Sequence, residues 1–244
     1  MRIAIVADIH SNLAAFQAVL RHAEETDSID RLWCLGDIVG YGPEPGACIA
    51  LFRRYPHSAV AGNHDLAAID KISTADFNAP GVRAAAWTAG QLTEEERQYL
   101  DELPEVTKEG KFTLVHATLR APVREYLLSQ EAAWEQFRLM ETPYSILGHT
   151  HLPFLAEELT DRRMRMEPWP EGERVELGEK RLIISPGSVG QPRDGDPRAA
   201  YALYDTEART FTLHRVEYDI AATQEKIRRA GLPVWLAERL GFGQ

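Results

Sequence analysis

Side chains that bind metal ions recur at the ends of apolar runs in this 244-residue sequence. Asp8 and His10 directly follow the first run, and four later runs end in the same way at Asp, Asn or His. The side chains concerned are Asp8, His10, Asp37, Asn63, His64, His116, His149 and His151. Imidazole, carboxylate and amide donors together suit divalent Mn, Fe, Ni, Zn or Mg, and the lack of thiolates disfavours a structural zinc site. The sequence therefore predicts a catalytic metal site.

Five short apolar segments have to bring these side chains together. They cover residues 3–7, 31–35, 58–61, 112–115 and 144–147, and their composition is typical of buried parallel strands. A helix is expected to begin near Leu13 with Ser11 or Asn12 as its N-cap, and another to carry Cys48 and Phe52. Because right-handed crossovers align parallel strands, we expect all motifs at one edge of one mainly parallel sheet. Ordinary hydrogen-bonding histidines do not explain why five of the eight histidines lie there.

The rest of the chain is expected to form helices, a hairpin and further strands. Helices are predicted over residues 80–90, 94–100, 122–128 and 131–140, and the second of these starts at a capping box formed by Thr93 and Glu96. Residues 159–173 are charged and contain prolines, which favours an exposed connection or hairpin. Strands of a second sheet are predicted over residues 181–184, 199–204 and 210–216, followed by helices over 220–230 and 233–240.

Length and composition narrow the class of protein. A chain of 244 residues with 44% hydrophobic residues can bury one sizeable core, so a single domain over residues 1–244 is expected. The formal net charge of −10 disfavours a long nucleic acid as partner, since such a partner needs a continuous basic face. Cys34 and Cys48 lack disulfide spacing, and neither a signal peptide nor a membrane-spanning run is recognisable. A cytoplasmic location without membrane partners is therefore predicted.

The motifs taken in order resemble those of the calcineurin-like metallophosphoesterase superfamily. The family pattern D-x-H, G-D, G-N-H-[DE], H and G-H-x-H is present in full between Met1 and about Val216. The fold that this resemblance implies is an α/β sandwich of two packed mixed β-sheets flanked by α-helices. A domain of that kind would carry the helices of residues 219–240 as an appendage.

The resemblance also implies roles for the individual motif residues. One metal would be bound by Asp8, His10, Asp37 and His151, and the other by Asp37, Asn63, His116 and His149. Asp37 would therefore bridge the two ions. His64 would be the catalytic histidine beside the metals, and the neighbouring Asp65 a possible orienting carboxylate.

The expected ligands leave the site electropositive. Two divalent ions carry four positive charges, of which Asp8 and Asp37 offset two, so that about two remain to face a substrate phosphate. Such a site holds phosphate and lowers the pKa of a bridging water, which favours direct attack of metal-bound hydroxide on phosphorus. Two divalent metal ions are thus the expected cofactors, with manganese favoured.

The substrate is expected to be a small phosphorylated molecule. Residues 36–43 and 185–193 resemble the YfcE-type branch of small phosphodiesterases, whose members cleave simple phosphodiesters or diadenosine tetraphosphate. Arginines that could bind phosphate through a bidentate guanidinium, or could equally lie on the surface, are Arg120, Arg124, Arg193 and Arg198. Ser188 lies in a glycine-rich turn without a clear following helix, which indicates a structural role.

Two alternative functions share the same motifs. A phosphomonoesterase or protein phosphatase would use the same metal ligands. A non-catalytic scaffold, like the metallophosphoesterase-like subunit of retromer, would use only the fold, and the retention of His64 beside complete ligands argues against it. Apolar residues of the C-terminal helices, among them Leu236 and Leu240, would cover the core or form a homodimer contact.

Overall fold

The N-terminal repeats of strand and helix build half of a mixed sheet. The computed structural model describes residues 1–159 and 163–244. Its first sheet has the strand order β3-β2-β1-β11-β12-β9. These strands are β1 (Arg2–Val6), β2 (Arg31–Cys34), β3 (His57–Ala59), β9 (Arg174–Glu176), β11 (Ala199–Asp205) and β12 (Thr210–Val216). The first three are parallel, and β11 continues the sheet antiparallel to β1.

A second sheet carries the remaining histidine motifs. Its strand order is β4-β5-β6-β10-β7-β8. The strands are β4 (Val106–Glu109), β5 (Phe112–Val115), β6 (Tyr144–Ile146), β7 (Pro153–Glu158), β8 (Met164–Pro168) and β10 (Leu182–Pro186). Strands β5, β6 and β10 are parallel to one another. The fold class is therefore the predicted α/β arrangement of two mixed sheets.

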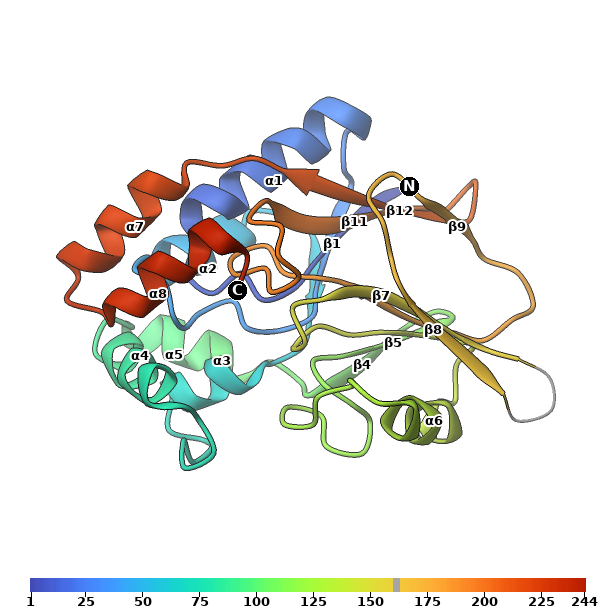
Figure 1. Cartoon of the computed structure of the whole chain (residues 1–244), viewed down its shortest axis with the longest axis horizontal. Helices are drawn as coiled ribbons and strands as arrows, with labels where there is room; N and C mark the ends of the chain where they lie inside the picture. Colours follow the sequence, from blue (N-terminus) through green and yellow to red (C-terminus); the bar gives the residue numbers. More distant parts are fainter. Residues whose placement is uncertain (160–162) are drawn as a thin grey trace.

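Alternating side chains of the strands hold the layers together. In β1, Ile3 and Ile5 join the apolar cluster between the sheets, whereas Ala4 and Val6 face the opposite way into the cluster beneath α1. On the first sheet lie α1 (Leu13–Asp27) and α2 (Pro45–Phe52), and α6 (Gln130–Leu139) covers the second. Figure 1 shows α1 and α6 on opposite sides of the molecule.

Further helices flank the end of the molecule where the strand motifs meet. They are α3 (Asn63–Ala68), α4 (Ala79–Ala89), α5 (Glu94–Asp101), α7 (Ile220–Arg229), α8 (Val234–Glu238) and a 3-10 turn (Arg239–Phe242). Ile227, Leu236 and Leu240 are buried in one cluster with Tyr41 of the β2–α2 loop, so the C-terminal helices do cover a part of the core. Among the described residues, no helix has the length and apolarity needed to cross a membrane.

Local signals predicted most of these elements. Asn12 caps α1 by accepting a hydrogen bond from the Ala15 amide, and Thr93 and Glu96 form the expected capping box of α5. The charged segment 159–173 lies partly in the β7–β8 hairpin, and the part over 160–162 is outside the described residues.

Three expectations about the fold are wrong. Residues 122–124 form a turn and residues 125–128 have no regular secondary structure, so no helix forms there. The Pro122 carbonyl instead accepts a hydrogen bond from the Ala117 amide at 2.8 Å. The motif strands belong to two sheets instead of one. Strands β11 and β12 belong to the first sheet, since β11 is buried along nearly its whole length and therefore takes a central position beside β1.

Candidate metal centre

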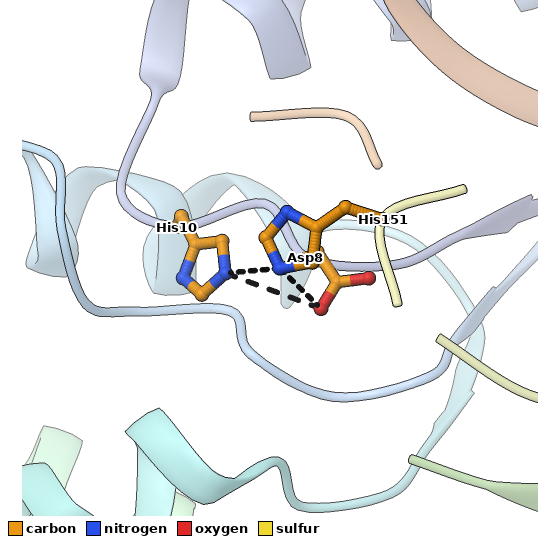
Figure 2. A group of neighbouring side chains, drawn as sticks. All are labelled: Asp8, His10 and His151. Carbon is orange, nitrogen blue, oxygen red and sulfur yellow. Dashed lines mark hydrogen bonds and ion pairs between the residues drawn. The ribbon is translucent and has the colours of Figure 1, made fainter. Parts of the chain in front are cut away.

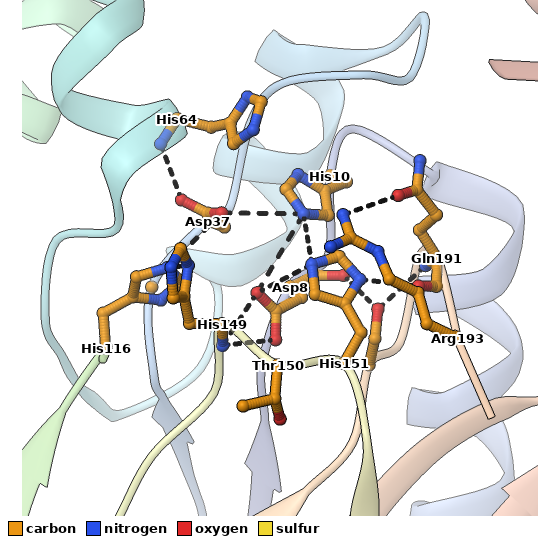
Figure 3. A network of polar contacts seen from close by, with 12 residues as sticks. Asp8, His10, Asp37, His64, His116, His149, Thr150, His151, Gln191 and Arg193 are labelled. Carbon is orange, nitrogen blue, oxygen red and sulfur yellow. Dashed lines mark hydrogen bonds and ion pairs between the residues drawn. The ribbon is translucent and has the colours of Figure 1, made fainter. Parts of the chain in front are cut away.

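Loops from both sheets deliver the predicted side chains to one buried site. The loops after β1, β2 and β3 approach from the first sheet, and those after β5, β6 and β10 from the second (Figure 3). The candidate ligands lie side by side, and each is buried, with an exposed fraction of at most 8%: Asp8, His10, Asp37, Asn63, His116, His149 and His151. The polar side chains that sequence reasoning assigned to a metal site are thus brought together inside the protein.

The first group of potential ligands consists of Asp8, His10 and His151, whose ligand atoms all lie within 4.8 Å of one another (Figure 2). The Nε2 atoms of the two imidazoles are 3.2 Å apart, and the Nε2 of His151 is 3.4 Å from Oδ1 of Asp8. The opposite Nδ1 atoms of these rings face the carbonyls of Val39 and Gln191 at 3.2 and 2.6 Å. Nδ1–H donation to those carbonyls leaves the Nε2 lone pairs free for a metal ion.

The second group consists of Asp37, His116 and His149. Nε2 of His116 lies 3.1 Å from Nδ1 of His149 and 3.5 Å from Oδ2 of Asp37. Asn63 adds its Oδ1 at 3.1 Å from the same His116 nitrogen. The outer nitrogens of the two rings again face carbonyls, that of Leu35 for His116 and that of Arg124 for His149.

Asp37 lies between the two groups. Its Oδ2 is 3.5 Å from Nε2 of His10 in the first group and 3.5 Å from Nε2 of His116 in the second. Its Oδ1 accepts a hydrogen bond from the His64 amide at 2.8 Å, which fixes the carboxylate in place. A carboxylate so placed can contribute ligand oxygen to either side.

The imidazole of His64 packs against three neighbouring rings. Its centroid lies 4.2 Å from that of Tyr41, 4.8 Å from that of Phe77 and 4.9 Å from that of His10. Its Nδ1 is buried without a hydrogen-bond partner among residues 1–159 and 163–244. Ligand atoms of His64, His10 and Asp37 lie within 4.8 Å of one another, so His64 borders the candidate metal centre.

Asp65 does not orient His64 as the motif had suggested. Its two carboxylate oxygens accept hydrogen bonds from the backbone amides of Asp37, Val39 and Gly62 at 2.8 to 3.0 Å. The first turn of α3 points this carboxylate into the β2–α2 loop, so it organises the backbone that carries Asp37.

Several candidate ligands have a left-handed backbone. The φ angles are 52° at Asp8, 48° at His10, 55° at Asp37, 64° at His149 and 59° at His151. Residues other than glycine seldom adopt this conformation, which clusters at functional sites. Gly62 allows the close approach that such loops need, since a Cβ there would lie 2.0 Å from Oδ1 of Asp37.

The electrostatics of the site suit a cation. Burial lowers the pKa of His10, His149 and His151 well below the usual value, and it lowers that of His116 to about 4, so the imidazoles are neutral. Burial raises the pKa of Asp37 to about 7. Neutral imidazoles and buried carboxylates that face one another form an electron-rich cage, and a divalent cation relieves the unfavourable burial of the carboxylate charge. The residues present therefore fit bound metal ions.

A cavity of about 210 Å³ opens beside the two groups. Arg124 and Arg193 line it, and Figure 3 shows Arg193 next to His151. The guanidinium of Arg193 donates a hydrogen bond to Oε1 of Gln191 at 3.0 Å.

The other two candidate arginines lie elsewhere. Arg120 is paired with Glu125, and Arg198 is paired with Asp196 and Glu171. Neither lines this cavity. Ser188 holds a turn as expected, because its hydroxyl donates to the Asp8 carbonyl and accepts from the Gln191 amide.

Sequence reasoning missed the aromatic lining of the cavity. Tyr41 and Phe77 contact His64, and the Tyr126 ring stacks on the His149 imidazole with a centroid distance of 3.9 Å. Tyr41 lies in the segment Gly40-Tyr41-Gly42, where an aromatic residue between glycines was a usable signal. No comparable pattern marks Phe77 or Tyr126.

Comparison with known proteins assigns the chain to a family. The chain matches the calcineurin-like phosphoesterase superfamily domain over residues 1–209, and it belongs to this family of metal-binding hydrolases. A crystal structure of a metallophosphoesterase from Sphaerobacter thermophilus is similar over 100% of this chain and 99% of that chain, with 43% identity and a TM-score of 0.90. The uncharacterized protein MJ0912 of Methanocaldococcus jannaschii is 38% identical over 247 residues, which cover 99% of this chain and 98% of that protein.

Two further proteins, both with functional names, match only a part of the chain. Serine/threonine-protein phosphatase 2 of Escherichia coli is 28% identical over 139 residues, or 53% of this chain and 63% of that protein. The symmetrical bis(5'-nucleosyl)-tetraphosphatase of Shewanella baltica is 41% identical over 63 residues, or 25% of this chain and 23% of that protein. Each of these two matches covers less than two thirds of the relative's own length.

Proposed function

We propose that this protein is a dinuclear metal-dependent phosphoesterase that hydrolyses phosphodiester or phosphoanhydride bonds of small substrates. The observation that carries the proposal is the position of Asp37, whose Oδ2 lies 3.5 Å from a histidine nitrogen of each ligand group. One carboxylate between two groups of neutral imidazoles is the arrangement expected for two ions that act on a single phosphate.

The roles of the individual residues in metal binding and catalysis would be those that the family resemblance implies. Asp8, His10 and His151 would hold one ion and Asn63, His116 and His149 the other, with Asp37 shared. When bound, two divalent ions supply Lewis acidity and a water nucleophile of lowered pKa, and manganese is the favoured metal. Arg193 would orient the phosphoryl oxygens from the cavity wall, and His64 would give a proton to the leaving oxygen.

The size and lining of the cavity support a small substrate. A volume of about 210 Å³ accommodates a phosphoryl group with part of its substituents, and the formal net charge of −10 disfavours long nucleic acids. The partial match to a bis(5'-nucleosyl)-tetraphosphatase supports phosphoanhydrides among these substrates. The partial match to a protein phosphatase keeps phosphomonoesters as the second candidate class.

A panel of substrates tests this proposal. We expect the manganese-loaded protein to turn over bis-p-nitrophenyl phosphate or diadenosine tetraphosphate faster than p-nitrophenyl phosphate or a phosphopeptide. Measurements of kcat/KM for all four compounds, with a metal-free sample as control, decide between the classes. Activity on monoesters alone would replace the first proposal by the second, and inactivity on every compound would contradict both.

A further inference from the structure

Arg124 lies beside the metal centre, and its guanidinium is paired with Asp76. Its backbone carbonyl lies 3.2 Å from Nε2 of His149, which anchors the residue next to the second ligand group. Its side chain lines the cavity and forms an ion pair with Asp76, while a second guanidinium nitrogen lies 3.4 Å from the Ser73 carbonyl. The residue is thus fixed at the site, and its guanidinium is held at the cavity mouth.

The ion pair joins two loops across that mouth. Asp76 belongs to the segment between α3 and α4, and Arg124 to the segment between β5 and α6. Both residues line the cavity, and their side chains are 52% and 41% exposed. Exposed pairs of this kind contribute little free energy, because water screens the charges and the side chains lose entropy. An anion of higher charge inside the cavity can therefore displace the Asp76 carboxylate.

Arg193 differs from Arg124 in its burial and in its partners. It lies directly at the candidate ligands, and its Nε is buried without a hydrogen-bond partner among residues 1–159 and 163–244. Arg193 is thus placed for the phosphoryl group under attack. Arg124, at the mouth, is placed for a group farther along the same substrate.

We propose that Arg124 is a specificity-determining residue that binds a second anionic group of the substrate, and that Asp76 occupies its guanidinium until such a substrate arrives. The inference rests on the proposed function and narrows it. A simple diester has a single negative charge, which the metals and Arg193 would engage, and Arg124 would stay on Asp76. A substrate with adjacent phosphoryl groups, such as a dinucleoside polyphosphate, would engage both arginines, since a guanidinium matches phosphate oxygens in a bidentate way.

A purely structural role of the ion pair predicts the opposite effect of the Asp76→Asn substitution on substrate binding. If the pair only clamped the two loops, loss of either partner would loosen the cavity and weaken binding in the same direction. If Asp76 competes with the substrate, Asp76→Asn strengthens the binding of a polyphosphate and Arg124→Ala weakens it. The sign of the Asp76→Asn effect therefore separates the two roles.

Calorimetry on the manganese-loaded protein measures whether Asp76→Asn raises or lowers the Kd of a polyphosphate. The probe is a methylene-bridged, non-hydrolysable analogue of diadenosine tetraphosphate. We expect Arg124→Ala to raise its Kd about 10- to 100-fold, the range for loss of a hydrogen bond to a charged group. Asp76→Asn should lower the Kd about 2- to 5-fold, as expected from release of an exposed ion pair.

Matched controls come from another exposed ion pair. Arg53 and Glu95 also join distant segments, with side chains 42% and 76% exposed, and neither lines the cavity. Arg53→Ala and Glu95→Gln should leave the Kd of the analogue unchanged. A thermal melt of each variant verifies that it is folded.

Three results with the variants, and one with the wild-type protein, would overturn the inference. The three are a weaker binding of the analogue by Asp76→Asn, an unchanged Kd in Arg124→Ala, and a loss in Arg124→Ala that is no larger than its effect on KM for bis-p-nitrophenyl phosphate. Failure of the proposed function has a different signature, because a wild-type protein that hydrolyses no compound of the panel still yields the signs of the two Kd changes. A wild-type protein that does not bind the analogue would contradict the inference directly.

Discussion

The floor and the rim of the cavity are built in opposite ways. The floor is the candidate metal centre, of which Asp37, Asn63, His149 and His151 line the cavity. All seven candidate ligands are buried, and contacts join segments as distant as Asp8 and His149. The rim consists of Asp76, Arg124 and Tyr126, which are 41 to 52% exposed. One exposed ion pair connects the two loops that carry these rim residues.

This difference separates the chemistry of the site from its choice of substrate. A ligand in the floor cannot change without exposing or emptying a buried polar site, so the floor fixes the class of reaction. A residue in the rim can change at little cost in stability, so the choice of substrate can change there without loss of a metal ligand.

The largest expected effect comes from breaking the floor at its centre. Asp37→Ala should remove metal from both positions, because Asp37 adjoins both ligand groups, and turnover should fall about 1,000-fold or more. His10→Ala should weaken mainly one position. Metal content of the purified variants, measured by mass spectrometry, checks this, and two fully occupied positions in Asp37→Ala would exclude the bridging role.

A more limited effect is expected at His64, because its loss should reduce turnover without removing metal. His64→Ala should keep both metals and lose about 100- to 10,000-fold in turnover on a nucleoside or alkyl diester, as general acids commonly contribute. The loss should be smaller on a nitrophenyl ester, because nitrophenolate departs without a proton. Rates on the two substrates provide the comparison. Equal losses would leave His64 an electrostatic role only, and unaltered rates on both would point to another catalytic site.

The smallest effects concern stability. Asp65→Asn should lower the free energy of unfolding by about 3 kcal/mol, since the buried carboxylate accepts hydrogen bonds from three backbone amides. Arg124→Ala should cost less than about 1 kcal/mol, because its ion pair is exposed. Urea unfolding of the metal-free variants measures both. If Arg124→Ala were as destabilising as Asp65→Asn, whose carboxylate holds the backbone that carries Asp37, the distinction between rim and floor would be lost.

The site was more predictable from the sequence than the connections between strands. Each ligand follows a short apolar run, and this local pattern located Asp8, Asp37 and His149 without knowledge of the pairing. The pairing of β1 with β11 joins residues about 200 positions apart, as in the register of Ile3 with Tyr204. Local propensity contains no information on such partners, which explains why β11 and β12 were assigned to the wrong sheet.

The side chains of Asp65 and Arg120 show the same limit, because their partners depend on the fold and cannot be read from neighbouring residues. Asp65 follows His64 in the motif, and adjacency suggested that it orients the ring, but the turn of α3 directs its carboxylate toward the amides of Asp37 and Val39. The sequence offered no basis for distinguishing Arg120 from Arg124 as a phosphate-binding residue. Two features separate them: the side chain of Arg124 lines the cavity, and its backbone carbonyl contacts His149. Both depend on the fold of the turn over residues 121–125.

The left-handed backbone of the ligand loops has a consequence for protein design. Five of the seven candidate ligands adopt it, at roughly 1 kcal/mol each, and the sum approaches the net stability of an ordinary domain. A designer who copied the seven side chains onto idealised loops of another scaffold would reproduce the chemistry of the donors but not their directions. The transferable unit is each turn together with its glycines and buried carboxylate, so this centre can be transplanted only with its surrounding backbone.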